Sequence, residues 1–166
     1  GYPEGVEITI VTYKETRPYN PAGGEKLAAA LQLDLARAGV KANIKAYPWR
    51  QYKEALLNKE GNAFLYGWIS DNCDPDNFLY TLLASSQIDS GLNTTHYRNN
   101  ELDPLLASAQ RETESTLREQ IYRKAVQIIN RDFPLFVLNH SLRLYATSPA
   151  IEGFKPSPTG FTQLGA

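Results

Sequence analysis

The sequence predicts an α/β fold built on a mixed, mostly parallel sheet flanked by helices. Apolar and polar residues alternate over residues 6–13 and again over residues 40–46, which is the period-two pattern of half-buried strands. Between them, leucines four residues apart form the apolar stripe of a helix over residues 22–38. Gly39 stands where a left-handed helix end is expected. A strand, a helix and a strand within about forty residues are typical of a right-handed crossover between parallel strands.

The next segments continue this order. Residues 49–58 are predicted to form a helix, and residues 63–68 a third strand that is largely buried because its side chains are mostly apolar or aromatic. The first strand is expected to end at residues 17–21, where Pro18 and Pro21 impose an extended turn. A length of 166 residues suits a single domain with one core.

The second half of the chain is predicted to be mainly helical. Ser115 or Thr116 is expected to cap the longest helix, since an acidic residue follows about one turn later. The expected elements are helices over residues 78–85, 100–111 and 115–131, a polar loop over residues 87–99, and short strands over residues 135–138 and 142–145.

Composition excludes several classes of function. The formal net charge is −1 and the 17 basic residues are scattered, so the sequence predicts no surface for nucleic acid. No apolar run approaches the roughly 20 residues that a membrane-spanning helix needs. The two histidines and the single cysteine, Cys73, do not stand in metal-ligand spacing, so neither a metal nor a cofactor is expected.

No catalytic residue is predicted. The sequence has no strand-to-helix nucleophile motif and no phosphate-binding glycine loop, and nothing beside Cys73 marks an activated thiol. His140 is expected to be a structural side chain between two short strands. The alternative is a hydrolase that uses Asp71, Asp74 and either His96 or His140, and it would need one of these groups beside a nucleophile.

The acidic segment over residues 71–77 allows two readings. Its alternating oxygen-bearing side chains suggest a calcium loop, but the positions that such a loop reserves for glycine and glutamate hold Asn77 and Leu83. A turn followed by a capped helix explains the segment without requiring glycine and glutamate at those two positions. We therefore interpret Asp74, Asp76 and Asn77 as turn and capping residues.

Asp71 differs from the other acids of this segment. It follows the third strand by three residues, at the carboxyl edge of the sheet, where ligands of open α/β sheets bind. Its carboxylate, beside the apolar wall that Trp68 offers, suits an ammonium group. Arg17 follows the first strand at the same expected edge, and its planar fork suits a carboxylate. The pair matches a zwitterion such as a dipeptide, or else forms a salt bridge when the site is empty.

Several motifs occur in a recognisable order along the chain. They are the turn over residues 17–21, the Gly67-Trp68 pair, and the stretch over residues 71–78. In this order they resemble the C-terminal lobe of family 5 of the bacterial extracellular solute-binding proteins, and the dipeptide-binding members most of all. The resemblance covers nearly the whole chain.

The resemblance implies a lobe of the periplasmic-binding-protein type II fold, in a protein that closes over a short peptide and delivers it to the permease of an ABC importer. It implies that Asp71 binds the peptide ammonium, that Arg17 binds the peptide carboxylate, and that Trp68 lines the pocket. Gly67 and Ser70 complete the expected site. The implied location is the periplasm or, as a lipoprotein, the cell surface.

The sequence also departs from the family pattern. Family members are much longer, so residues 1–166 are expected to be a C-terminal lobe whose N-terminal partner lobe is absent, with residues 149–166 crossing towards that lobe. Cys73 stands where close relatives often have glycine, so the loop is expected to be stiffer or slightly re-aimed. Longer peptides, nickel chelates, haem and opine-like solutes are the alternative ligands for the same fold.

Overall fold

The computed structural model describes residues 2, 5–142 and 144–157. The chain divides into two compact units, Gly1–Trp68 and Ile69–Ala166. One apolar core lies in the α/β part of the first unit and another among the helices of the second. The expectation of a single core is therefore wrong, because the two kinds of architecture bury their apolar side chains separately.

The first unit is built on a parallel sheet in the order β2-β1-β3. Strand β1 (Val6–Tyr13) pairs in register with β2 (Val40–Tyr47) over its full length, so both strand predictions are confirmed. Strand β3 is only Ala63–Phe64, not residues 63–68. The register explains why the strand does not reach residues 67 and 68. Phe64 pairs with Val11, so residues 67 and 68 lie beyond the end of β1 and have no strand to pair with.

Two helices cover this sheet. Helix α1 (Gly24–Arg37) connects β1 to β2, and helix α2 (Trp49–Leu57) connects β2 to β3, so both helix predictions are confirmed. The crossovers through α1 and α2 run in opposite directions along the sheet, and right-handed crossovers of this kind place their helices on opposite faces. Each strand can supply side chains to both faces, because successive side chains of a strand point to opposite sides of the sheet. Gly39 follows Ala38, the C-cap of α1, and its φ of 79° confirms the predicted left-handed helix end.

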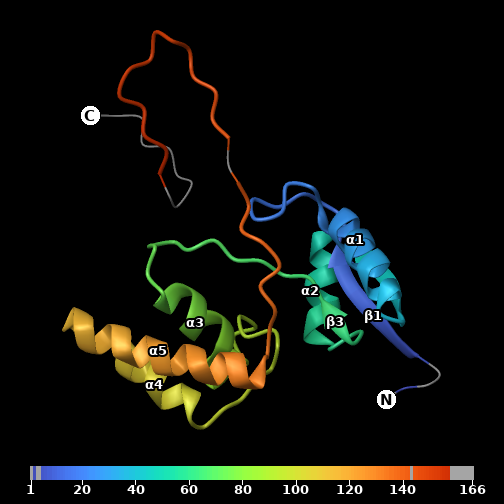
Figure 1. The fold of residues 1–166 in the computed structure, drawn as a ribbon, viewed down its shortest axis with the longest axis horizontal. Helices are drawn as coiled ribbons and strands as arrows, with labels where there is room; N and C mark the ends of the chain where they lie inside the picture. The colour runs from blue at the N-terminus through green and yellow to red at the C-terminus, as the bar shows by residue number, and fades with distance from the viewer. Residues whose placement is uncertain (1, 3–4, 143, 158–166) are drawn as a thin grey trace. The chain divides into compact units, whose positions relative to one another are not determined.

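The second unit is helical and contains α3 (Asp76–Leu83), a short 3-10 turn η1 (Ser85–Gln87), α4 (Leu102–Ala109) and α5 (Ser115–Asp132) (Figure 1). These ranges confirm the predicted helices with small changes at their ends. The core of this unit consists of buried side chains from these helices and the residue that follows α3: Leu83, Ala84, Leu102, Leu106, Ala125 and Ile129. None of the helices in the described part of the chain is long and apolar enough to cross a membrane.

Helix α5 begins with a cap that the sequence pattern missed. The carboxylate of Glu114 accepts hydrogen bonds from the backbone N–H groups of Thr116 at 3.0 Å and Leu117 at 2.6 Å. These two donors lower the pKa of Glu114. The prediction of a Ser or Thr cap is wrong because the acid one position earlier reaches both free N–H groups at once.

The segment after α5 differs most from its prediction. The helix ends at Phe133, whose φ is 54°, and no helix or strand follows over residues 134–142 and 144–157. The strands predicted over residues 135–138 and 142–145 are therefore absent from the described residues. An apolar stretch becomes a strand only beside a partner strand, and the described residues of this unit contain none. Of the tail over residues 149–166, which is expected to cross towards the remaining lobe, residues 158–166 lie outside the described residues.

Candidate functional site

Arg17 lies in a tight turn just past the carboxyl end of β1, where the sequence predicted it. Its backbone N–H donates to the Asn20 carbonyl at 3.1 Å, and the Asn20 N–H donates back to the Arg17 carbonyl at 2.8 Å. The Asn20 side chain, itself buried, donates to the hydroxyl of Tyr13 at 3.1 Å. These bonds tie the turn to the last residue of β1, so the position of Arg17 is fixed by the sheet.

An aromatic cluster surrounds the Arg17 side chain, which is half-buried. The guanidinium carbon lies 3.5 Å from the ring centroid of Trp49, the first residue of α2. The Trp49 ring packs edge-to-face against the Tyr13 ring, with 5.6 Å between the ring centroids. It also makes a tilted contact with the Tyr52 ring, with 5.4 Å between the centroids. The Nε atom of Arg17 is buried without a hydrogen-bond partner in the described structure. No local pattern in the sequence indicates that Trp49 belongs to the site.

Gly67 lies against the ring of Tyr19. A Cβ atom on Gly67 would stand 2.1 Å from Cδ2 of that ring, so only glycine allows this packing. Burial raises the pKa of Tyr19 to about 12, against the opposing effect of the Arg17 guanidinium. The Tyr19 hydroxyl is buried and has no hydrogen-bond partner among the described residues. Gly67 thus serves the packing of an aromatic ring, and Trp68, half-buried, follows it at the end of the unit.

The remaining predicted site residues open the second unit. Ser70 is buried, and its hydroxyl donates to the Asn72 side chain at 3.2 Å while accepting from the Asn72 N–H at 3.4 Å. Asp71 is exposed. Its N–H donates to Oδ1 of Asn77 at 3.2 Å, and the Asn77 amide donates to Oδ2 of Asp71 at 3.5 Å. The side-chain amide of Asn77 therefore orients the Asp71 carboxylate.

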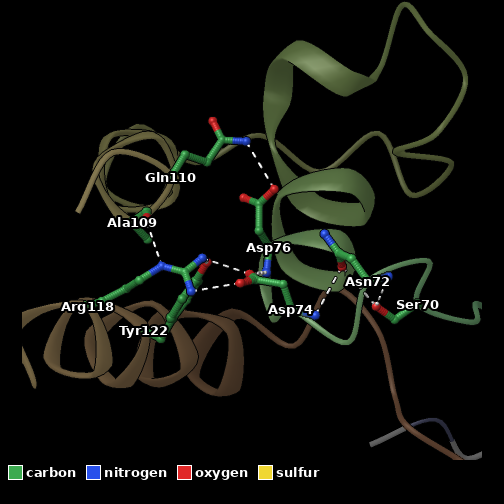
Figure 2. Close-up of polar contacts among 8 residues, drawn as sticks. All are labelled: Ser70, Asn72, Asp74, Asp76, Ala109, Gln110, Arg118 and Tyr122. Atoms are coloured by element: carbon green, nitrogen blue, oxygen red, sulfur yellow. Dashed lines mark hydrogen bonds and ion pairs between the residues drawn. The ribbon is translucent and has the colours of Figure 1, made fainter. Parts of the chain in front are cut away.

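The other acids of this loop, Asp74 and Asp76, are half-buried and bound by side chains of the second unit. Figure 2 shows the guanidinium of Arg118 facing the carboxylate of Asp74, with hydrogen bonds of 2.8 and 2.7 Å. Arg118 also donates to the carbonyl of Ala109 at 2.8 Å, and Gln110 donates to Asp76 at 3.2 Å. The Arg118 guanidinium holds the pKa of Asp74 below its usual value.

Asp74 also serves the turn, as the sequence analysis predicted. Its carboxylate accepts the backbone N–H of Asp76 at 2.8 Å, and its N–H donates to the Asn72 side chain at 3.0 Å (Figure 2). Asp76 is the first residue of α3, not its cap. The contact with Arg118 spans 44 positions of sequence and was missed. Within the loop, this leaves Asp71 as the acid whose carboxylate lies on the surface.

Neither histidine adds to this group of residues. His140 is exposed and lies outside any strand, so the prediction of a structural side chain between strands is wrong. His96 is half-buried in a turn with a φ of 54°. Among the residues that the structure describes, no three His, Cys, Asp or Glu side chains gather in an arrangement that could hold a metal.

Comparison with known proteins gives these features a context. The sequence profile described as "Bacterial extracellular solute-binding proteins, family 5 Middle" matches residues 1–90, which include both the Arg17 turn and the Asp71 loop. The chain belongs to this family. Its fold is that of the periplasmic binding proteins, as the sequence analysis expected.

Similar proteins with known sequences include a dipeptide-binding protein of Pseudomonas aeruginosa, 35% identical over 158 residues. Heme-binding protein A of Haemophilus influenzae is 35% identical over 161 residues. These matches cover 95% and 97% of this chain. The chain spans 29% of the length of either relative.

Solved structures agree with these sequence matches. A dipeptide-binding protein of Pseudoalteromonas sp. in complex with Met-Leu superposes with a TM-score of 0.75 at 35% identity, over 81% of this chain and 26% of that one. HbpA2 of Haemophilus parasuis superposes with a TM-score of 0.85 at 33% identity, over 98% of this chain and 32% of that one. Both similarities support membership of a solute-binding transport family.

Proposed function

We propose that residues 1–166 are the C-terminal ligand-binding lobe of a two-lobed protein that captures short peptides, in particular dipeptides, for an ABC importer. The proposal rests on the family, on relatives whose names describe dipeptide binding, and on two charged side chains, Arg17 in the turn after β1 and Asp71 in the loop that opens the second unit. Its partners are the peptide, the importer's permease and the remaining lobe. The protein is proposed to act in the periplasm or, as a lipoprotein, at the cell surface.

The main support for the proposal is that Arg17 and Asp71 carry opposite charges and that neither forms an ion pair with another described residue. Arg17 stacks on an aromatic ring and takes part in none of the ion pairs between described residues. Asp71 is exposed and is held by an amide, whereas Asp74 is bound by Arg118. We assign the peptide carboxylate to Arg17 and the peptide ammonium to Asp71.

The neighbouring residues fit supporting roles in this site. Trp68 is assigned to the wall of the pocket, where a large half-buried ring offers apolar surface. Gly67 allows the ring of Tyr19 to pack beside Arg17, and the buried hydroxyl of Tyr19 is a candidate partner for the ligand. Ser70 orients the start of the Asp71 loop through its bonds to Asn72.

Binding of this kind requires no covalent step. Fixed charges that meet both ends of a peptide select its length, while its side chains are left in permissive, hydrated pockets. Closure of two lobes over the ligand would exclude water and strengthen both ion pairs. The exposed apolar side chains of residues 133–142 and 144–157 are proposed to pack against the remaining lobe.

Haem is the second candidate ligand, because heme-binding protein A of Haemophilus influenzae is as similar to this chain as the dipeptide-binding relative is. A haem ligand has no ammonium group and would place no demand on the Asp71 carboxylate. The two candidates therefore differ in their dependence on Asp71.

The test is calorimetric titration of the complete two-lobed protein with a dipeptide, before and after Asp71→Ala. Loss of one partner of a desolvated ion pair costs about 2 to 5 kcal/mol, so affinity is expected to fall at least thirtyfold. Asp89→Ala, an exposed acid outside the loop, is the matched control and is expected to leave affinity unchanged. Near-equal affinities of the wild type and Asp71→Ala would refute the assignment. Haem titration of the same two proteins, followed by absorbance, separates the second candidate.

A further inference from the structure

We propose that Trp49 is a positioning residue that holds the Arg17 guanidinium in one plane, and so sets how strongly the protein prefers a ligand with a free carboxylate. This inference rests on the proposed function. It adds a residue from α2 to a site that the sequence places on the turn after β1 and the loop after β3.

The contact is close and face-on. The Cζ atom of Arg17 lies 3.5 Å from the centroid of the Trp49 ring, which is van der Waals distance for stacked planar groups. A guanidinium that is stacked on an indole keeps its N–H donors in its own plane, directed past the edge of the ring. The stacking therefore restricts the orientation of Arg17 without using the donors that a carboxylate needs.

The ring of Trp49 is itself held in place. It packs edge-to-face on Tyr13, which is 1% exposed, and in a tilted contact on Tyr52, which is fully buried. The Tyr52 hydroxyl donates to the carbonyl of Leu65, which joins this tyrosine to the segment after β3. At the start of α2, the backbone N–H of Trp49 donates to the carboxylate of Glu15 at 3.2 Å. These contacts join the Trp49 ring to the last residue of β1 directly, and to the residue after β3 through Tyr52.

Stacking also leaves the charge of Arg17 unneutralised. A salt bridge would orient the side chain but would compete with an incoming carboxylate, and none of the described ion pairs involves Arg17. The buried Nε atom, which lacks a partner among the described residues, is a donor that an anion can satisfy. Trp49 accordingly prepares Arg17 for a bidentate contact before the ligand arrives.

The experiment compares two ligands, a dipeptide and the same dipeptide with a C-terminal amide, on the complete protein. Trp49→Leu is expected to weaken dipeptide binding about five- to thirtyfold, the effect of losing a partly desolvated cation–π contact. It is expected to leave the affinity for the amide unchanged, because the amide does not use the Arg17 charge. Trp49→Phe keeps an aromatic face and is expected to retain most of the dipeptide affinity. Leu57→Ala, an exposed position of α2, is the control for general effects on the helix.

The Arg17→Met background supplies the decisive comparison. If Trp49 acts through Arg17, then Trp49→Leu has no further effect on dipeptide affinity once Arg17 is replaced. Equal losses for both ligands, additive losses in the Arg17→Met background, or a Trp49→Phe variant as weak as Trp49→Leu would each overturn the positioning role. A wild-type protein that binds the dipeptide and its amide equally would instead overturn the proposed function, and this role with it. Unfolding curves for every variant separate loss of folded protein from loss of affinity.

Discussion

Arg118 of α5 and Asp74 of the loop before α3 are joined by two parallel hydrogen bonds of 2.8 and 2.7 Å (Figure 2). Both side chains are less than one-third exposed, at 27% and 31%. Arg118 also donates to the Ala109 carbonyl at the end of α4. One side chain therefore connects α4, α5 and the loop that carries Asp71.

Arg118→Met is expected to lower the free energy of unfolding by about 1 to 2 kcal/mol, because the Asp74 carboxylate loses a bidentate, charge-assisted partner while partly shielded from water. Urea unfolding followed by far-UV circular dichroism measures the change. Arg123→Met removes an ion pair of the same helix whose side chains are 74% and 60% exposed, and it should change stability by less than about 0.5 kcal/mol. Equal effects of the two substitutions would show that the Asp74 contact is no stronger than a surface pair.

Acidification is expected to weaken the second unit through two carboxylates. The contact with Arg118 lowers the pKa of Asp74, and the contacts with Arg131 and Tyr97 lower that of Asp132 to about 2. A carboxyl whose pKa is lower in the folded state stabilises the fold fully above its unfolded pKa of about 4. That contribution is lost as the pH falls towards the folded pKa.

Urea midpoints at pH 6 and pH 3 measure this loss. The wild type is expected to lose more stability between these two values than the Asp132→Asn variant does, because the amide cannot take up a proton. Equal losses for the wild type and the variant would show that Asp132 is not linked to folding. Since several carboxyls titrate in this range, the difference between the two proteins is the informative quantity, not either midpoint alone.

Cys73 has a φ of 59°, in the left-handed region that favours glycine. This finding gives a physical reason for the glycine that the family resemblance led us to expect at this position. A side chain in this conformation costs about 1 to 2 kcal/mol, whereas glycine costs about 0.5 to 1 kcal/mol of unfolded-state entropy. Because Cys73 is exposed, no packing is lost on replacement.

Cys73→Gly is therefore expected to raise the free energy of unfolding by about 0.5 kcal/mol. Cys73→Val should lower it by about 1 kcal/mol, since a β-branched residue fits this backbone region least well. Thermal unfolding of the three proteins gives the order. If valine proved as stable as glycine, the loop would have to adopt another backbone conformation in solution.

The close approach of Gly67 and Tyr19 gives a prediction for the first unit. A methyl group on Gly67 would overlap the Tyr19 ring, with a contact of 2.1 Å, and overpacking of this kind costs about 1 to 3 kcal/mol. Gly67→Ala is expected to destabilise the wild type by this amount. In a Tyr19→Ala background the same substitution should cost less than about 0.5 kcal/mol, because the obstructing ring is gone. A double-mutant cycle from urea unfolding measures the coupling, and equal costs in both backgrounds would contradict it.

The parts of the fold that were predicted correctly depend on local patterns. The strands β1 and β2 and the five helices follow from alternation and from apolar stripes within each segment, and their bounds differ from prediction by few residues. Arg17 lies just beyond β1, as the same patterns predicted, whereas Asp71 lies in the second unit, seven positions after the end of β3.

The parts that were missed depend on distant partners. Nothing near Asp74 in the sequence indicates Arg118, which lies 44 positions away and contacts it only because α4 packs against both α3 and α5. Trp49 reads locally as the first residue of a helix, and its stacking with Arg17 follows only from the parallel order of the strands. The predicted strands after residue 134 failed for a related reason, because apolar alternation does not supply a neighbouring strand.

The apolar segment after α5 gives the last prediction. Leu142 and Leu144 are 82% and 87% exposed in this chain, so replacing both with serine should change its free energy of unfolding by less than about 0.5 kcal/mol. The replacements should reduce the binding of an apolar dye and the self-association of the chain, measured by fluorescence and by sedimentation. Leu102→Ala is the contrasting variant, since that side chain is fully buried and its loss should cost about 2 to 5 kcal/mol. In the complete protein the double replacement should instead be destabilising, because the two leucines are then expected to be covered by the remaining lobe. A complete protein that tolerates both serines as well as the isolated chain does would show that this segment is not buried there.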